Sequence, residues 1–168
     1  MTPLPGALGD GTLVGWRVDQ SKYATTWDSG EGAFQSGGRW NSRGVRAVYC
    51  SVDPATAILE VAVHKGFDVL DALPHVLTRF EIMDPTAVHV TDSNDVANPN
   101  WLVPGSPSAG QQRFGDSLLE NYKFVLIPST VSKHSWNLLF VASNASGQYG
   151  NITQEPLSID TRLNPPAP

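Results

Sequence analysis

Glycine and proline punctuate this chain densely and limit the length of every helix and strand it can form. The 168 residues include 15 glycines and 13 prolines. Glycine favours turns, and proline interrupts both helices and sheet ladders. We therefore expect short elements joined by long loops. The length suits one domain with a sizeable core and is short for two, so the sequence predicts a single compact domain.

The overall composition excludes several classes of protein. Forty per cent of the residues are hydrophobic and 16% are charged, against roughly a quarter charged in an average globular domain. Mean hydropathy is -0.18. This excludes a disordered, collagen-like or coiled-coil chain. Eleven Lys and Arg against sixteen Asp and Glu give a net charge of -5, so no summed positive field gathers polyanions and we expect no direct nucleic-acid binding.

Neither the start of the chain nor its cysteine points to export. Met1–Gly6 has no basic segment or apolar run of a signal peptide, and no window reaches the ~18 apolar residues of a membrane helix. We expect a cytoplasmic protein that contacts no membrane. Cys50 is the only cysteine and has no internal partner, and its apolar neighbours predict a buried strand in which it acts as a small hydrophobe.

Hydrophobic periodicity predicts more strands than helices. Strands are expected at 13–18, 45–52, 75–82, 87–91, 124–127 and 137–142. The 45–52 segment is apolar on both faces and is therefore expected in the centre of the sheet, whereas 75–82 alternates as a half-buried strand does. Asp53-Pro54 supplies an N-cap and a first-turn proline for a helix over 55–65 that Gly66 ends.

The remaining segments are expected to be a short helix over 114–121, an extended glycine-rich loop over 26–44, a mobile excursion over 93–112 and a polar tail over 151–163 that wraps back over the domain. Because strands are often separated only by turns, we favour an α+β fold over a doubly wound parallel sheet.

The helix over 55–65 carries the most informative residue. It is apolar almost all round and should be buried, yet Glu60 lies in its middle. A buried carboxylate is either paired with a cation or lines a cleft that ligand or water reaches, and a glutamate that extends to the surface is the alternative. His64, four residues later, shares its face and is also explained as a partly exposed helix residue.

A second cluster, Gly37-Gly-Arg-Trp-Asn41, precedes the central strand. Its glycines let backbone N–H groups approach a phosphate and Arg39 offers a planar donor fork, although the same residues occur in ordinary turns. The chain has no Walker A or dinucleotide-binding glycine motif and no nucleophile-elbow serine.

Other candidates for chemistry are weaker. The four histidines and Cys50 have no metal-ligand spacing, so we expect no metal site. Ser129 follows Pro128 at a strand end, where it is a turn residue or a hydroxyl at the mouth of a cleft. Trp27, Trp101 and Trp136 are expected in the core or in a lid.

Several motifs, taken together in order and spacing, resemble the RES domain, which is named for an Arg, a Glu and a Ser. They are Gly15-Trp-Arg17, Lys22-Tyr-Ala24, Ser29-Gly-Glu-Gly-Ala33, Gly37-Gly-Arg-Trp-Asn-Ser42, Val48-Tyr49, Ala57-Ile-Leu-Glu-Val61, Ile127-Pro-Ser129, Asn137-Leu-Leu139 and Ile159-Asp-Thr-Arg-Leu163. The resemblance covers residues 12–163, between an N-terminal tail of 1–11 and a C-terminal tail of 164–168.

The resemblance implies a fold and an activity. RES proteins are usually toxins of bacterial type II toxin–antitoxin pairs, with an ADP-ribosyltransferase-like mixed sheet. Their relatives cleave the nicotinamide–ribose bond of NAD with water or phosphate as acceptor, or transfer ADP-ribose to a protein. NAD is then a substrate and no cofactor is implied. The expected partner is an Xre-type antitoxin, and such toxins often self-associate as homodimers.

The resemblance also implies residue roles. The Arg, Glu and Ser for which the domain is named correspond to Arg17, Glu60 and Ser129. Tyr49 matches a tyrosine of the family's NAD pocket, so these four are the expected catalytic residues. In addition, Arg39, Asn41 and Tyr23 are expected to bind substrate.

One segment departs from the family. Phe140–Ser146 stands where relatives commonly have Asn-Pro and a His, which leaves the C-terminal edge of the site open. A catalytically silent module that binds a nucleotide or a protein is the competing hypothesis. A ribonuclease is disfavoured by the negative charge and the scattered histidines.

Overall fold

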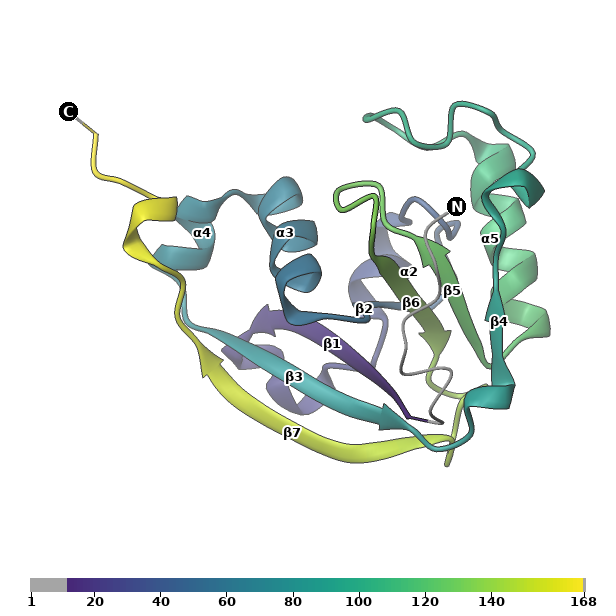
Figure 1. Cartoon of the computed structure of the whole chain (residues 1–168), viewed down its shortest axis with the longest axis horizontal. Helices are drawn as coiled ribbons and strands as arrows, with labels where there is room; N and C mark the ends of the chain where they lie inside the picture. Colours follow the sequence, from purple (N-terminus) through teal and green to yellow (C-terminus); the bar gives the residue numbers. More distant parts are fainter. Residues whose placement is uncertain (1–11, 168) are drawn as a thin grey trace.

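The computed structural model describes residues 12–167, and it contains a mixed seven-stranded sheet with helices packed on it (Figure 1). The strands are β1 (Leu13–Gln20), β2 (Ala47–Ser51), β3 (His75–Ile82), β4 (Val88–Val90), β5 (Phe124–Pro128), β6 (Trp136–Val141) and β7 (Tyr149–Leu157), in the order β4-β5-β6-β2-β1-β3-β7. Only β4 and β5 pair in parallel. The predicted single α+β domain with a mixed sheet is confirmed, and β2 is central as expected.

Four α-helices and four short 3-10 turns complete the described part of the chain. The helices are α2 (Glu31–Ser36), α3 (Pro54–Lys65), α4 (Phe67–Ala72) and α5 (Ala109–Asn121), and the 3-10 turns are η1 (Ser21–Thr26), η2 (Pro85–Ala87), η3 (Ser93–Asp95) and η4 (Thr161–Leu163). None of these helices has the length and apolar character that crossing a membrane requires.

The helix that carries Glu60 begins and ends where local chemistry predicts. The Asp53 carboxylate accepts the Thr56 N–H at 2.8 Å, Pro54 fills the first turn, and Gly66 ends α3 at a φ of 85°. Through Ala57 and Ala62, α3 packs with Val18 and Leu77 of the sheet. Its middle is therefore held against β1 and β3.

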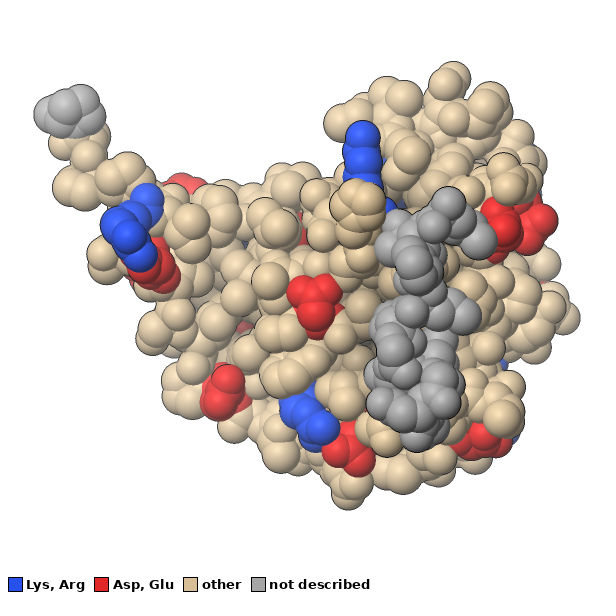
Figure 2. Space-filling view, in the orientation of Figure 1, with Lys and Arg blue, Asp and Glu red and all other residues tan. Residues whose placement is uncertain are grey.

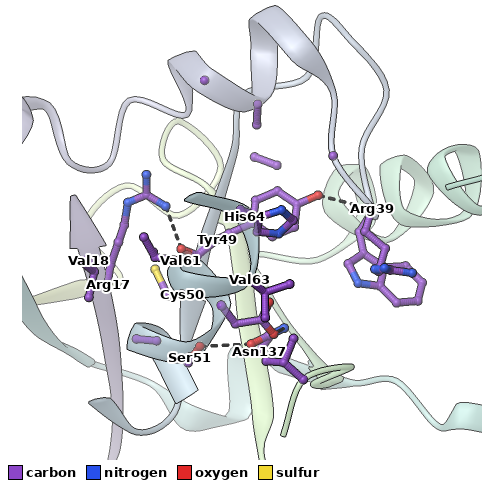
Figure 3. Close-up of a pocket in the computed structure, with 18 of the residues that line it drawn as sticks. Arg17, Val18, Arg39, Tyr49, Cys50, Ser51, Val61, Val63, His64 and Asn137 are labelled. Atoms are coloured by element: carbon purple, nitrogen blue, oxygen red, sulfur yellow. Dashed lines mark hydrogen bonds between the residues drawn. The ribbon is translucent and has the colours of Figure 1, made fainter. Parts of the chain in front are cut away.

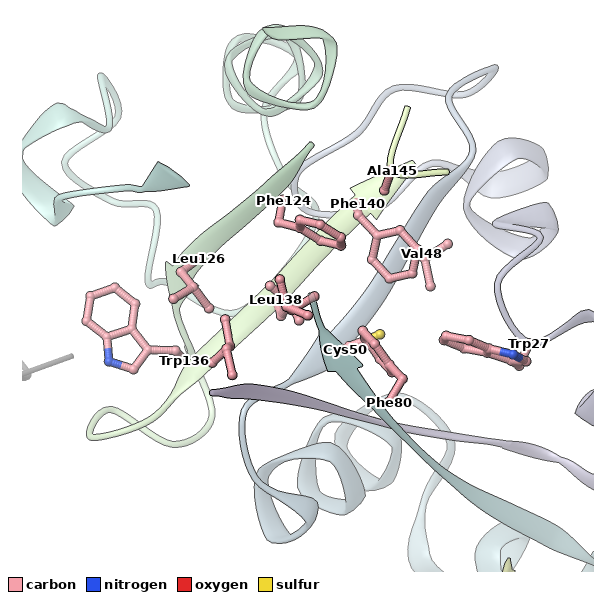
Figure 4. Packing of buried hydrophobic residues seen from close by; sticks show 12 residues of the cluster. Trp27, Val48, Cys50, Phe80, Phe124, Leu126, Trp136, Leu138, Phe140 and Ala145 are labelled. Carbon is pink, nitrogen blue, oxygen red and sulfur yellow. The ribbon is translucent and has the colours of Figure 1, made fainter. Parts of the chain in front are cut away.

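The opposite face of the sheet holds the largest aromatic cluster (Figure 4). Phe80 and Phe140 are fully buried there, with ring centroids 5.7 Å apart, and Trp27 packs on Phe80 at 5.0 Å. Cys50 is buried in the same cluster, as predicted, and burial raises the pKa of its thiol to about 12.

Several loop predictions were wrong. The 26–44 segment contains α2, and α4 was not expected. The 93–112 segment includes the first turns of α5, because Ser108 caps that helix and accepts the Gln111 N–H at 3.1 Å. Trp101 in this segment is buried against Trp40, with ring centroids 5.5 Å apart, so the loop is packed on the domain.

Two sheet predictions also need correction. The 151–163 segment is not a tail, because its first half belongs to β7. Strand β7 pairs antiparallel with β3, and the pairing runs from His75 opposite Leu157 to Ile82 opposite Tyr149. Since β3 therefore lies between two strands, and α4 packs near it, its first four residues are buried rather than half-buried. The predicted tail of residues 1–11 lies outside the described residues.

Candidate active site

A pocket of about 470 Å³ opens on the helical side of the sheet, where β1 and β2 separate (Figure 3). These two neighbours are registered only at Trp16–Ser51, whereas β1 and β3 pair over eight positions. Arg17 of β1, Tyr49 of β2 and Glu60 of α3 all line the pocket. Three of the four predicted catalytic residues therefore meet in one cavity.

The carboxylate of Glu60 is held by two donors on one of its oxygens. Oε1 accepts the Ser129 hydroxyl at 2.9 Å and the Asn137 side-chain amide at 2.6 Å. Oε2 has no hydrogen-bond partner among residues 12–167 and remains available to a ligand. The Glu60 carboxylate is thus fixed in orientation through one oxygen, and the other oxygen can contact a ligand.

Ser129 has a defined hydrogen-bond polarity. Its Oγ accepts the backbone N–H groups of Val131 at 3.2 Å and Ser132 at 3.0 Å. A hydroxyl has one proton and two acceptor positions, so the proton is directed to Glu60. Ser129 is 1% exposed and is absent from the described pocket lining, so the contact that the structure shows for its proton is the Glu60 carboxylate.

Asn137 is the site residue that sequence reasoning left out. It lines the pocket and contacts Glu60 directly, from a position 77 residues further along the chain. The only available signal was its place at the start of the Asn137-Leu-Leu139 match, which carried no role. The expectation placed Glu60 beside a cation or in a cleft, and the structure places it in the cleft with two neutral donors.

Arg17 is anchored so that part of its guanidinium stays free. Nε and Nη2 donate to the two oxygens of Asp19 at 2.9 and 2.8 Å, and Nη1 donates to the Tyr49 carbonyl at 2.7 Å. These three bonds leave two of the five N–H groups of a guanidinium unused. The side chain is 25% exposed at the pocket, so the remaining donors suit an anionic group.

Tyr49 connects the central strand to the glycine-rich loop. Its hydroxyl donates to Asn41 Oδ1 at 2.7 Å and accepts the Trp40 N–H at 3.0 Å. Gly38 makes this approach possible, because a Cβ there would lie 2.6 Å from the hydroxyl oxygen. Burial raises the pKa of Tyr49 above its usual value, which keeps the hydroxyl protonated and able to donate.

The three predicted substrate-binding residues have different positions. Arg39 lines the pocket, and its Nη1 donates to the Trp101 carbonyl at 2.8 Å. Asn41 is fully buried, its two amide N–H groups are shared among three backbone carbonyls, and it is absent from the described pocket lining. Tyr23 is 50% exposed in η1 and lies outside the lining.

The charges at the pocket differ from those of the chain as a whole. Arg17, Arg39, His64 and Lys65 line it, and Glu60 is the one carboxylate among its described lining residues. In Figure 3 the two arginines flank Tyr49 and His64 from opposite sides. On the face in Figure 2, by contrast, basic side chains are scattered among acidic ones. The cavity therefore suits a small ligand that carries both negative and positive charge.

The segment that departs from the family lies away from this cavity. None of residues 140–146 is among its described lining. Ala145 is instead fully buried in the aromatic cluster on the opposite face. Within residues 12–167 no cluster of three or more His, Cys, Asp or Glu could hold a metal ion.

Fold and pocket together define a single α+β domain with a carboxylate at the centre of a cation-lined cleft. The RES domain model matches residues 14–160, and the chain belongs to the RES domain family. It is 28% identical to Toxin Res of Photorhabdus laumondii over 159 residues, which covers 90% of this chain and 97% of that protein.

Two further comparisons extend this finding. The chain is 34% identical to the Prs ADP-ribosylating toxin of Sphingobium sp. over 132 residues, covering 74% of this chain and 79% of that protein. The crystal structure of the M. tuberculosis MbcT-MbcA toxin-antitoxin complex contains a chain with the same fold, at a TM-score of 0.62 and 19% identity, covering 93% of this chain and 94% of that one.

Proposed function

We propose that this protein is the toxin of a type II toxin–antitoxin pair that cleaves the nicotinamide–ribose bond of NAD, with water or phosphate as acceptor, and so depletes cellular NAD and arrests growth. The observation that carries the proposal is Glu60, whose Oε1 is held by two donors and whose Oε2 has no partner among the described residues, in a pocket that two arginines also line. Membership of the RES family and the name of the Sphingobium relative support a reaction that uses NAD.

The proposed chemistry matches the charges of the pocket. Cleavage of the glycosidic bond builds oxocarbenium charge on the ribose, and a fixed carboxylate stabilises that charge without reorganisation. The free Oε2 of Glu60 takes this role, while Ser129 and Asn137 hold the carboxylate still. Nicotinamide leaves as a neutral molecule from a cationic pyridinium, so the bond breaks without a separate general acid.

The other residues bind the two ends of the dinucleotide. The unused N–H groups of Arg17 bind the pyrophosphate through charge-assisted hydrogen bonds, and Arg39 adds a second cation on the far side of Tyr49. The Tyr49 ring lines the pocket and stacks on nicotinamide. Substrate is thereby oriented with its reacting ribose at Glu60.

Purified protein incubated with NAD, with and without phosphate, tests this proposal. We expect release of nicotinamide, with ADP-ribose or its phosphorylated form identified by mass. Glu60→Gln keeps the size of the side chain and removes its charge, and we expect it to lower turnover by at least about a hundredfold. Glu120→Gln, on the exposed surface of α5, is the matched control and should retain full activity. Equal turnover in Glu60→Gln and wild type would contradict the mechanism.

Transfer of ADP-ribose to a protein is the second candidate, favoured by the name of the Sphingobium relative. It predicts little free ADP-ribose with NAD alone and a labelled protein band when radiolabelled NAD is added with a cell extract. NAD binding without any turnover or labelling would favour the silent binding module instead.

We also propose an Xre-type antitoxin as partner. The support is the solved neighbour, which is a toxin in complex with its antitoxin. Co-expression with the protein encoded beside this chain should restore growth and yield a complex by gel filtration. Gel filtration of the chain alone tests whether it forms a homodimer.

A further inference from the structure

We propose that Ser51 is a positioning residue that acts on Glu60 through Asn137. This inference rests on the proposed function of the pocket. It assigns a task to a serine at the end of the central strand, where β2 passes into α3. The three side chains form a continuous hydrogen-bonded series in the direction Ser51 to Asn137 to Glu60.

The direction of each bond follows from chemistry. A carboxylate oxygen only accepts, so Asn137 must present its NH2 group to Oε1 of Glu60 at 2.6 Å. The amide oxygen of Asn137 then points the other way, and it accepts the Ser51 hydroxyl at 3.0 Å. With its proton committed to Asn137, Ser51 fixes which end of the amide faces the carboxylate.

Burial makes this orientation matter. Ser51 is 2% exposed and Asn137 is 8% exposed, so water does not readily replace either partner. Asn137 also pairs with Ser51 in the β2–β6 ladder, which fixes the backbones from which the two side chains extend. Without the hydroxyl, the amide oxygen is buried without a donor, and rotation of the amide would place an oxygen against the Glu60 carboxylate.

Ser51 also lines the pocket, so a direct ligand contact is the competing explanation. The two explanations differ in kinetics. A residue that touches the ligand in the ground state changes KM, whereas one that fixes the carboxylate for the transition state changes kcat. They differ also in coupling, because a residue that acts through Asn137 has no effect once the Asn137 amide is gone.

The experiment is a double-mutant cycle on nicotinamide release. We expect Ser51→Ala to lower kcat by about three- to tenfold and Asn137→Ala by about ten- to a hundredfold, both with KM within about twofold of wild type. In the Asn137→Ala background, Ser51→Ala should lower kcat no further. Ser51→Thr, which retains the hydroxyl, should recover most of the lost rate.

Ser135→Ala is the matched control. Ser135 is also a buried serine with one side-chain partner, since its hydroxyl donates to Asp53 at 2.5 Å and not to Asn137. Its effect on kcat should be the same in both backgrounds. Independent, multiplying losses for Ser51→Ala and Asn137→Ala, or a change in KM alone, would overturn the proposed role of Ser51.

The same variants separate failure of this inference from failure of the proposed function. If wild type releases no nicotinamide, the proposed reaction fails, and the side-chain amide signals of Asn137 in a nitrogen–proton NMR spectrum still test the relay. Ser51→Ala should shift these signals and speed their exchange with water, whereas Ser135→Ala should not. Unchanged Asn137 signals in Ser51→Ala would refute the relay whether or not the protein is an enzyme.

Discussion

The hydroxyl of Tyr49 is expected to contribute more to stability than to catalysis. Tyr49→Phe removes only this oxygen and leaves the ring in the pocket. The oxygen has two partners in buried residues: Asn41 Oδ1 at 2.7 Å and the Trp40 N–H at 3.0 Å. Asn41 is 0% exposed and Trp40 is 2% exposed, so both partner atoms lose a hydrogen bond that water does not restore.

The size of the effect follows from these two lost bonds. A buried polar group left without a partner costs about 1–3 kcal/mol, so we expect Tyr49→Phe to lower the free energy of unfolding by roughly 2–4 kcal/mol. For a domain of this size that corresponds to a fall in Tm of roughly 5–15 °C. Urea unfolding followed by tryptophan fluorescence measures it, because Trp40 adjoins the lost bond.

Tyr122→Phe is the matched control. Tyr122 is 41% exposed, stacks on His89 and has no hydroxyl hydrogen bond among the described residues. Loss of the Tyr122 hydroxyl should change the free energy of unfolding by less than about 0.5 kcal/mol. Well below its Tm, Tyr49→Phe should keep most of its kcat, since stacking needs only the ring. A stability equal to that of wild type would refute the idea that the hydroxyl holds the glycine-rich loop.

The same hydroxyl predicts a pH dependence. Because burial raises the pKa of Tyr49 in the folded state, the folded chain holds this proton more tightly than the unfolded chain does. Its contribution to stability is complete below the unfolded pKa of about 10 and is lost as the pH rises beyond it. Between pH 9 and 11, unfolding free energies should therefore decline less steeply in Tyr49→Phe than in wild type.

Three further predictions concern the pocket, the thiol and the cap of α3. Gly32 lines the pocket, and a Cβ there would meet nothing within 4 Å, so a larger side chain would extend into open space. Gly32→Leu should therefore raise KM for NAD at least about fivefold, whereas Gly110→Leu on α5 should not. Equilibrium binding of NAD to both variants provides the check. Since burial raises the pKa of Cys50 to about 12, iodoacetamide at pH 8 should modify it only in urea, as mass spectrometry will show. Burial acts to raise the pKa of Asp53, but hydrogen bonds from Ser135 and Thr56 lower it overall. The contribution of the Asp53 carboxylate to stability is therefore present above about pH 4 and is lost at lower pH. Asp53→Asn should lower the free energy of unfolding by about 1–2 kcal/mol at pH 7, and urea unfolding at pH 3 should show a smaller difference from wild type.

The sequence predicted best the elements whose limits depend on neighbouring residues. Helix α3 begins one residue before the predicted start and ends at Lys65 as expected, because Asp53, Pro54 and Gly66 act locally. Helix α2 was missed because it has only six residues, contains Gly32 and lies between Gly30 and Gly37 in a glycine-rich stretch of the chain. Strand β7 was missed because it is an edge strand with mostly exposed, polar residues, and only its pairing with β3 defines it.

The site was predictable in its residue types but not in its geometry. The unusual position of Glu60 in an apolar helix, together with the family resemblance, identified the carboxylate. Its partners Ser129 and Asn137 lie 69 and 77 residues further along the chain, and no local pattern pairs residues over such separations. Asn41 shows the converse: this motif residue, expected to bind substrate, is fully buried against the Tyr49 hydroxyl and is absent from the described pocket lining.

The distribution of charge connects the acidic composition to the proposed substrate. A net charge of -5 gives the chain no long-range attraction for a polyanion, but a small ligand responds to the charges within a few ångströms. Arg17 and Arg39 line the pocket, and Glu60 is the one carboxylate among its described lining residues. NAD carries the complementary pair, an anionic pyrophosphate and a cationic pyridinium. As the bond breaks, the positive charge moves from the pyridinium to the ribose. A carboxylate fixed beside the ribose therefore attracts the transition state more strongly than the substrate. The arginines contact the pyrophosphate, whose charge does not change, so they bind substrate and transition state alike. In the proposed reaction, the two donors to Glu60 Oε1 keep this carboxylate in place for the transition state, and the Asp19 contacts hold Arg17 in place for the substrate.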